Sequence, residues 1–220
     1  MPASVRGRAH WMPAQSEPTV TLLLRHGQTP SSVEKRYAGR SDVPLTDVGV
    51  RQAAAAGERL ACAGINLIVT SPLLRAVRTA EEVAAATGAP VEADEDFRET
   101  DFGAWDGLTF AEVRERWPAE LTAWMADPAV APPGGESFAD VSTRVDAALR
   151  RVLVGHQGQT VLIVSHVTPI KTLVAAALLA PPPALYRMHL DVAALCQVDW
   201  YADGPAVLRS YNDTGHLPAE

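Results

Sequence analysis

Basic and imidazole side chains follow short apolar runs at three separate places in the sequence. Arg25 and His26 come directly after one run, His166 comes directly after another, and Arg75 lies shortly beyond a third. An arginine can hold two phosphate oxygens at once, and each charge-assisted hydrogen bond contributes roughly 1.5–3 kcal/mol net. These four residues therefore indicate a binding site for an anion such as phosphate.

The same residues could also transfer a phosphoryl group. Nearby arginines disfavour a further positive charge, so His26 is expected to stay neutral and able to attack phosphorus. A local backbone carbonyl would fix the proton on its other ring nitrogen. The leaving oxygen needs a proton, and the acidic loop 95–106 offers Glu99, beside Gly103 and Trp105, as the best donor.

The sequence shows no metal-binding pattern. It has no GxxxxGK[ST] loop and no obvious cluster of carboxylate ligands. Cys62 and Cys196 lack the spacing of a zinc site, and both are expected to be buried thiols. Two arginines and a protonated histidine could neutralise the charge that Mg²⁺ neutralises in many phosphoryl-transfer sites. We therefore predict that the site needs no metal ion.

Strands that alternate with helices would have to position these side chains. The apolar runs 20–24, 66–70 and 161–165 read as strands, and each is followed in the chain by a helical segment. This order predicts βαβ units and one mostly parallel sheet that is covered on both faces. In such sheets, ligands bind beyond the carboxyl ends of the strands, so the polar side chains that follow the runs would meet at one rim.

Ser and Thr residues at cap positions predict where the main helices begin. The expected helices span 46–61, 71–87, 137–154 and 168–179, and two late strands span 192–201 and 207–211. The loop 28–45 and the segment 108–136, which carries two shorter helices, are expected to cover the pocket and set substrate choice.

Composition places the chain among ordinary globular proteins, because 47% of its 220 residues are hydrophobic and 20% are charged. Residues 1–18 read as a flexible tail or linker before a single domain, 19–220. No secretory signal and no membrane span are visible, so a cytoplasmic protein is expected. The net charge of -7 argues against nucleic-acid binding by this chain itself.

Six segments, in order, resemble the motifs of the histidine phosphatase superfamily, also called the phosphoglycerate-mutase-like family. TLLLRHGQT at 21–29 is similar to the family signature, and the resemblance covers roughly residues 19–211. The further segments are PLTDVG at 44–49, SPLLRAVRTA at 71–80, FRETDFGAWDG at 97–107, PPGGESFADV at 132–141 and VSHVTPIK at 164–171.

The resemblance implies a role for each residue of the predicted rim. His26 would be the phosphorylated nucleophile, and Glu99 would protonate the leaving group and then activate water. Arg25, Arg75 and His166 would form the phosphate pocket. The implied fold is a three-layer α/β/α sandwich with one sheet, and hydrolysis in this family needs no metal or organic cofactor.

Several positions depart from the family pattern. Ser31 and Ser32 stand where a Trp-Asn pair is common, and Val167 and Thr168 stand where Gly-Gly is common. Ser32, Val167 and Thr168 are expected to contact substrate, together with Gly39 in the covering loop. Glu136, in the loop before the helix 137–154, reads either as a contact to an arginine or as a solvated loop residue.

The resemblance is strongest to α-ribazole phosphatase and to the acid phosphatase half of actinobacterial bifunctional ribonuclease H/acid phosphatase proteins. The primary hypothesis is hydrolysis of small phosphate monoesters, and a longer parent protein could carry a ribonuclease H domain upstream. A phosphoglycerate-type mutase and a non-catalytic phosphate-binding module are the alternatives. The sequence predicts neither the physiological substrate nor the oligomeric state.

Overall fold

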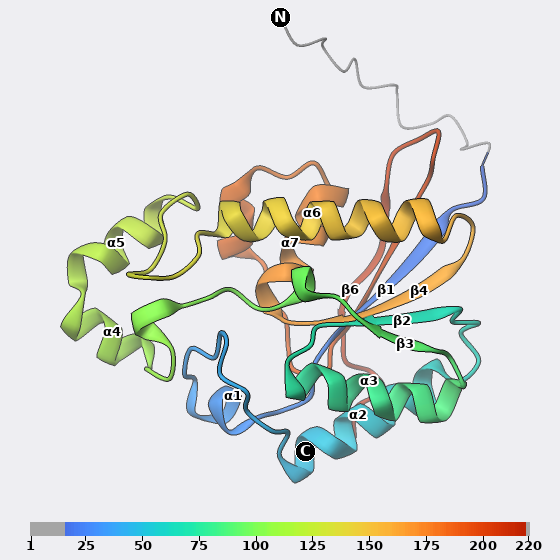
Figure 1. The fold of residues 1–220 in the computed structure, drawn as a ribbon, viewed down its shortest axis with the longest axis horizontal. Helices are drawn as coiled ribbons and strands as arrows, with labels where there is room; N and C mark the ends of the chain where they lie inside the picture. The colour runs from blue at the N-terminus through green and yellow to red at the C-terminus, as the bar shows by residue number, and fades with distance from the viewer. Residues whose placement is uncertain (1–15, 219–220) are drawn as a thin grey trace, which may run out of the picture.

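Six strands form one mixed, mostly parallel sheet in the order β3-β2-β4-β1-β5-β6 (Figure 1). The computed structural model describes residues 16–218, so most of the predicted tail lies outside the described residues. β1, β2, β3 and β4 run parallel to one another, and β5 is antiparallel to both of its neighbours, β1 and β6. The strands are β1 (Thr19–Arg25), β2 (Leu67–Thr70), β3 (Val91–Ala93), β4 (Thr160–Ser165), β5 (Leu195–Trp200) and β6 (Val207–Asp213).

Helices cover both faces of the sheet, which confirms the predicted three-layer sandwich. In Figure 1, α6 (Phe138–Gly155) and α7 (Val167–Ala177) lie above the sheet, and α2 (Asp47–Leu60) and α3 (Leu74–Thr87) lie below it. Three shorter helices lie to one side of the sheet: α1 (Pro30–Glu34), α4 (Phe110–Arg116) and α5 (Pro118–Ala126). Three 3-10 turns complete the set: η1 (Glu95–Phe97), η2 (Gly103–Trp105) and η3 (Pro182–Arg187).

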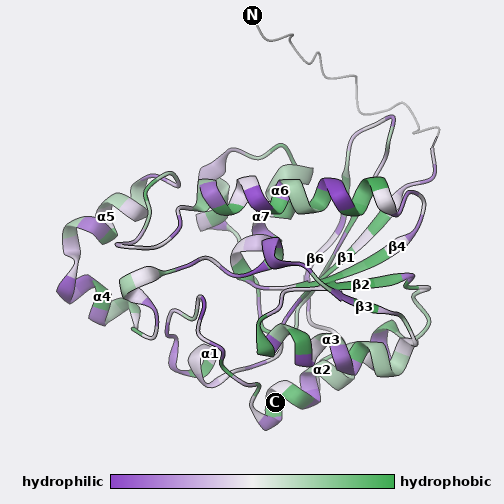
Figure 2. Ribbon diagram, in the orientation of Figure 1, coloured by the Kyte–Doolittle hydropathy of each residue, from purple (hydrophilic) through white to green (hydrophobic). Residues whose placement is uncertain are grey.

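Alternate side chains along the strands enter opposite cores, because successive residues of a strand point to opposite faces. Leu23 and Ile163 pack in the core that includes residues of α6 and α7. Their neighbours Leu24 and Leu162 pack with α2 and α3. All four are completely buried, and the central strands are coloured largely as hydrophobic in Figure 2. This two-sided burial fixes the register of the central strands, since a one-residue slip would exchange the two faces.

A third apolar cluster lies under α4 and α5, away from the sheet. It contains Trp105 and Trp124, whose rings meet edge to face with centroids 5.5 Å apart. Trp105 is completely buried, so its ring packs in this cluster beside the acidic loop.

Two helix starts differ from the prediction. α3 begins at Leu74 rather than at Ser71, because the Ser71 hydroxyl accepts the Leu73 N–H and bonds the ring of His166. α7 begins at Val167 with His166 as its N-cap residue, so Thr168 lies inside the first turn and does not cap it. The loop 28–45 also contains α1, a single short helix that the sequence reading missed.

The prediction of two buried thiols is wrong for Cys62. Cys62 is exposed because α2 ends at Leu60, so the cysteine lies in the exposed turn beyond the helix. Cys196 is buried in β5, and burial raises the pKa of its thiol to about 11. None of the helices within residues 16–218 has the length and apolar character needed to cross a membrane.

Gly27 and Gly49 allow the chain after β1 to lie directly against the first turn of α2. A Cβ atom on Gly49 would stand 2.1 Å from the Gln28 carbonyl oxygen, and one on Gly27 would stand 2.4 Å from the Gly49 oxygen. Backbone atoms form both contacts, so no side-chain rotation could relieve them.

Gly49→Ala should therefore lower the free energy of unfolding by about 1–3 kcal/mol, the usual cost of overpacking. Urea denaturation measures this change. Gly155→Ala is the matched control, because a Cβ atom there meets nothing within 4 Å. Equal stability of the two variants would contradict the packing argument.

Candidate active site

The two strand-end histidines lie side by side because β1 and β4 pair in parallel register. Arg25 is aligned with Ser165, and the His26 N–H donates to the Ser165 carbonyl at 3.0 Å. The next residue on each strand is a histidine, so the rings of His26 and His166 have centroids 5.1 Å apart. The predicted meeting of these residues at one rim is confirmed.

His26 is held as a neutral imidazole with one nitrogen available. The Gly27 carbonyl lies 2.8 Å from Nδ1, and a carbonyl can only accept, so Nδ1 carries the proton and Nε2 keeps its lone pair. Burial lowers the pKa of His26 well below its ordinary value, and the charges of Arg75 and Arg25 lower it further. This electrostatic environment is the one expected for a nucleophilic histidine.

Two arginines supply positive charge beside His26. Arg25 donates from Nη1 to the Leu190 carbonyl at 2.6 Å, and its Nε is buried without a partner among the described residues. Burial lowers the pKa of Arg25 to about 10, which leaves it charged at neutral pH. Arg75 is almost completely buried, and its guanidinium donates to three carbonyls of the segment 38–41.

His166 is completely buried behind His26. Its Nε2 lies 2.7 Å from the Ser71 hydroxyl, and its Nδ1 has no partner among the described residues. Burial, followed by the charges of Arg75 and the other basic groups, lowers the pKa of His166 well below its ordinary value. The protonated form considered from the sequence therefore needs the negative charge of a bound anion.

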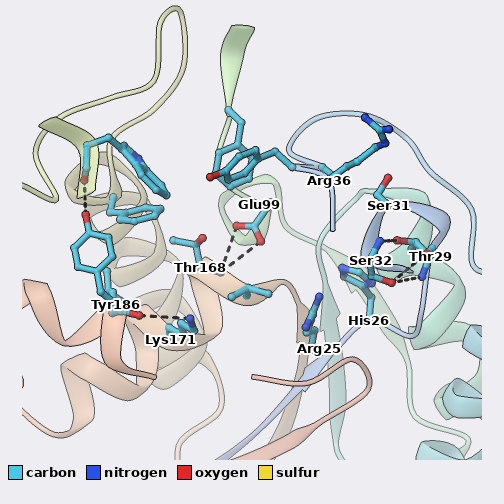
Figure 3. A pocket seen from close by; sticks show the side chains of 17 residues that line it. Arg25, His26, Thr29, Ser31, Ser32, Arg36, Glu99, Thr168, Lys171 and Tyr186 are labelled. Atoms are coloured by element: carbon cyan, nitrogen blue, oxygen red, sulfur yellow. Dashed lines mark hydrogen bonds between the residues drawn. The ribbon is translucent and has the colours of Figure 1, made fainter. Parts of the chain in front are cut away.

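Glu99 is buried at the far side of the same rim, where α7 begins. Its Oε1 accepts the Thr100 N–H at 2.8 Å, and the Thr168 N–H is shared between Oε1 at 3.3 Å and Oε2 at 3.4 Å (Figure 3). Oε2 has the fewer and longer contacts. It is therefore the oxygen better placed to exchange a proton with a bound molecule.

An ion pair between Glu136 and Arg144 fastens the loop that carries Glu99. Arg144 donates to the carbonyls of Asp96, Arg98 and Glu99 and to both oxygens of Glu136. Glu136 in turn accepts the Asp101 N–H at 3.0 Å. The expected contact of Glu136 to an arginine is confirmed, and Arg144 is a positioning residue that the sequence reading missed.

A cavity of about 400 Å³ opens onto the rim, a size typical of small-molecule sites. Arg25, His26 and Glu99 line it directly (Figure 3), whereas Arg75 and His166 are buried and are not among the lining residues. Within residues 16–218, no group of three or more His, Cys, Asp and Glu side chains is arranged to hold a metal ion.

The four predicted substrate contacts have different surroundings. Val167 and Thr168 line the cavity, but Glu99 takes the Thr168 N–H. Ser32 also lines it, yet its hydroxyl accepts the Thr29 N–H and donates to the Thr29 carbonyl, as part of a capping box. Gly39 is not among the lining residues, because its N–H donates to Asp106 and its carbonyl accepts from Arg75; its placement in the substrate site is corrected.

Further lining residues were not foreseen from the sequence. Lys171 lies one turn beyond Thr168 on α7, and this spacing places both on one helix face. That spacing was the available signal for Lys171. No comparable pattern marks the aromatic wall, which comes from distant segments and consists of Tyr37, Phe102, Trp124, Phe138 and Tyr186.

An α/β/α sandwich whose parallel strands end in histidine and arginine, opposite a buried glutamate, defines the phosphoglycerate-mutase-like class of protein. The chain belongs to the histidine phosphatase superfamily (branch 1), whose family model matches residues 21–214. The solved structure of mycobacterial glucosyl-3-phosphoglycerate phosphatase Rv2419c in complex with VO3 is similar, with a TM-score of 0.82 and 32% identity. That match covers 89% of this chain and 100% of the other.

Two curated relatives of this chain carry different functional names. The bifunctional protein Rv2228c of Mycobacterium tuberculosis (strain ATCC 25618 / H37Rv) is 51% identical over 208 residues, which are 94% of this chain and 57% of the relative. The chain therefore spans little more than half of that protein. The probable phosphoglycerate mutase GpmB of Citrobacter koseri is 38% identical and matches 90% of this chain and 94% of its own length.

The Glu136–Arg144 pair makes a prediction for stability. Burial alone would raise the pKa of Glu136, but hydrogen bonds from Arg144 and Asp101 bring it below the ordinary value of 4.5. Glu136→Gln should lower the free energy of unfolding by roughly 1.5–3 kcal/mol at pH 7, the range for hydrogen bonds to charged groups.

The pH dependence of this difference gives a second test. A carboxyl whose pKa is lower in the folded state stabilises fully above its unfolded pKa and loses that stabilisation as pH falls. The gap between wild type and Glu136→Gln should shrink below about pH 4.5 in urea titrations. Glu81→Gln is the control, because its pair with Arg78 is exposed and worth roughly 0–1 kcal/mol. A gap that is constant from pH 7 to pH 3 would contradict this account.

Proposed function

We propose that the chain hydrolyses small phosphate monoesters through a phosphoryl group carried on His26. The observation that carries this proposal is the free Nε2 of a neutral, buried histidine at a cavity that also exposes Arg25 and Glu99. A nucleophile, a cation for phosphate oxygens and a proton carrier thereby face one space. Membership of the histidine phosphatase superfamily supports the same reading.

In the first step, Nε2 of His26 attacks phosphorus and the ester P–O bond breaks. Glu99, protonated before the step, gives its proton to the departing alkoxide from the side of Oε2. Arg25 holds the phosphoryl oxygens, and the buried positive charge of Arg75 adds to the stabilisation of their negative charge. The negative charge of the bound phosphate favours a protonated His166, whose unpartnered Nδ1 can then donate a hydrogen bond.

In the second step, a water molecule enters the place of the leaving alcohol and attacks the same phosphorus. Glu99, now ionised, removes a proton from this water, and the P–N bond breaks. Inorganic phosphate leaves, neutral His26 is restored and Glu99 is protonated again. Because the phosphoryl group stays beside Arg25 throughout, the chain's own cations can neutralise its charge in both steps.

The low pKa of His26 favours activity in mildly acidic solution. An ordinary histidine loses its nucleophilic lone pair as the pH falls below about 6.5. Burial and two arginine charges keep His26 neutral below that pH. This supports an acid phosphatase activity. Similarity to the solved structure of a putative alpha-ribazole-5'-P phosphatase from Escherichia coli, with a TM-score of 0.82 and 28% identity, makes α-ribazole phosphate a candidate substrate.

A mutase is the second candidate function, because one relative is named a probable phosphoglycerate mutase. A mutase must keep the first product bound and return the phosphoryl group to it before water enters. With phosphoglycerates as substrates, the proposed phosphatase releases inorganic phosphate faster than it forms the isomer. Isomerisation that outpaces phosphate release would favour the mutase.

His26→Ala should lower kcat/KM for 4-nitrophenyl phosphate by at least about 1,000-fold, as expected when a covalent nucleophile is removed. The measurement is a continuous assay of nitrophenolate release, with EDTA present, and EDTA should leave wild-type turnover unchanged. His156→Ala is the matched control, because that imidazole lies outside the cavity and bonds Gln159. Retention of turnover in His26→Ala would refute the proposed nucleophile.

A further inference from the structure

Lys171 supplies a positive charge at a distance from the phosphate-holding Arg25. It projects from α7 into the cavity near Tyr186, on the opposite side of Glu99 from His26 (Figure 3). Its ammonium makes one long hydrogen bond, from Nζ to the Leu185 carbonyl at 3.4 Å. Within residues 16–218, no carboxylate forms an ion pair with it.

The other cations of the cavity already have partners or a task. Arg36, at the rim, forms ion pairs with Glu34 at 2.6 Å and with Glu112 at 3.0 Å. Arg25 lies beside His26, where the phosphate would bind. Among the described residues that line the cavity, Glu99 is the only acid, and in the proposed mechanism it is protonated when the substrate binds. Lys171 is therefore left without a compensating negative charge at that moment.

Partial burial makes the uncompensated charge of Lys171 unfavourable, so the site would favour ligands that carry a negative charge. Lys171 is partly buried; this burial lowers the pKa of its ammonium, whereas the charge of Glu99 raises it. An anionic group on the bound molecule would restore the balance through a charge-assisted hydrogen bond. A lysine acts on such a group as a point charge, without the two-pronged geometry of arginine.

Aromatic rings line the same cavity as His26 and Lys171. Trp124, Phe138 and Tyr186 form one group, with Trp124 and Phe138 centroids 5.0 Å apart and Phe138 and Tyr186 centroids 5.8 Å apart. Tyr37 and Phe102 form a second group, 4.8 Å apart. Such walls favour a flat or apolar body, and the cavity of about 400 Å³ has room for one beside a phosphate.

We propose that Lys171 is a specificity-determining residue, and that the preferred substrates are phosphate esters of an aromatic or apolar alcohol that carries an anionic substituent. This inference rests on the proposed phosphatase activity. The phosphate binds at His26, the apolar body lies against the aromatic wall, and the substituent pairs with the Lys171 ammonium. A neutral leaving group of the same size gains the apolar contacts but not the ion pair.

Matched aryl phosphates test this pairing. Each pair has one carboxylate and one neutral carboxamide. The pairs are 3-carboxyphenyl and 3-carbamoylphenyl phosphate, 4-carboxyphenyl and 4-carbamoylphenyl phosphate, and 4-(carboxymethyl)phenyl and 4-(carbamoylmethyl)phenyl phosphate. The quantity compared is the ratio of kcat/KM values within a pair. Wild type should favour the carboxylate in at least one pair, and Lys171→Met should lower that ratio by about tenfold, the effect of one charge-assisted hydrogen bond.

The chain offers a matched control, because Lys35 is its only other lysine and is exposed outside the cavity. Lys35→Met removes the same charge and should leave every ratio unchanged, whereas Lys171→Arg should retain part of the preference. Thermal melting of each variant reports on folding. A Lys171→Met effect that is equal for carboxylate and carboxamide, or absent, overturns the inference. Wild type that turns over none of the six esters refutes the phosphatase proposal instead.

Discussion

The in-register pairing of β1 with β4 is the constraint on which the site depends. Because Arg25 lies opposite Ser165, the residues that follow, His26 and His166, must emerge next to each other. The pairing is fixed by two buried faces, so it cannot slip without exchanging the two cores. Ser71 follows β2 at the same edge, and the Ser71 hydroxyl orients the His166 ring. One backbone alignment thereby sets the positions of the imidazoles.

A second set of contacts brings the acid to this edge. Glu99 lies on a loop rather than on a strand, and loops need additional contacts to hold a side chain in one place. Arg144 bonds three loop carbonyls, Glu136 holds Arg144 and the Asp101 N–H, and α7 donates the Thr168 N–H to the carboxylate. The acid is thus positioned from the same helix that carries Lys171. The proposed proton carrier and the proposed specificity residue therefore both depend on the position of α7.

The sequence predicted the parts of the site that follow from strand ends and local motifs. The positions of Arg25, His26 and His166 could be predicted because polar residues that follow buried parallel strands lie at the carboxyl edge of the sheet. Glu99 and Arg75 were also brought to the site, although Arg75 is not among the lining residues of the cavity. The ribonuclease H domain of a longer parent protein, the cytoplasmic location and the substrate class of small phosphate monoesters stay predictions.

Other features could not be read from local patterns. The aromatic wall and the ion pair of Glu136 with Arg144 join segments far apart in the chain, which a single sequence does not pair. Gly39 was predicted to contact substrate, but its N–H donates to Asp106 and its carbonyl accepts a hydrogen bond from Arg75. Cys62 was misplaced because α2 ends before it, and helix ends are set by tertiary contacts as well as by sequence.

Direct detection of phosphorylated His26 tests the central claim. The Glu99→Gln variant, mixed with 4-nitrophenyl phosphate and quenched in alkali, should accumulate the intermediate, because nitrophenolate needs little protonation whereas attack by water needs the Glu99 base. Mass spectrometry of peptides from the quenched protein should find one phosphoryl group on the peptide that contains His26, and none in Glu99→Gln/His26→Ala. A phosphoryl group on another residue, or phosphate release by Glu99→Gln with no labelled peptide at any time, would contradict the account.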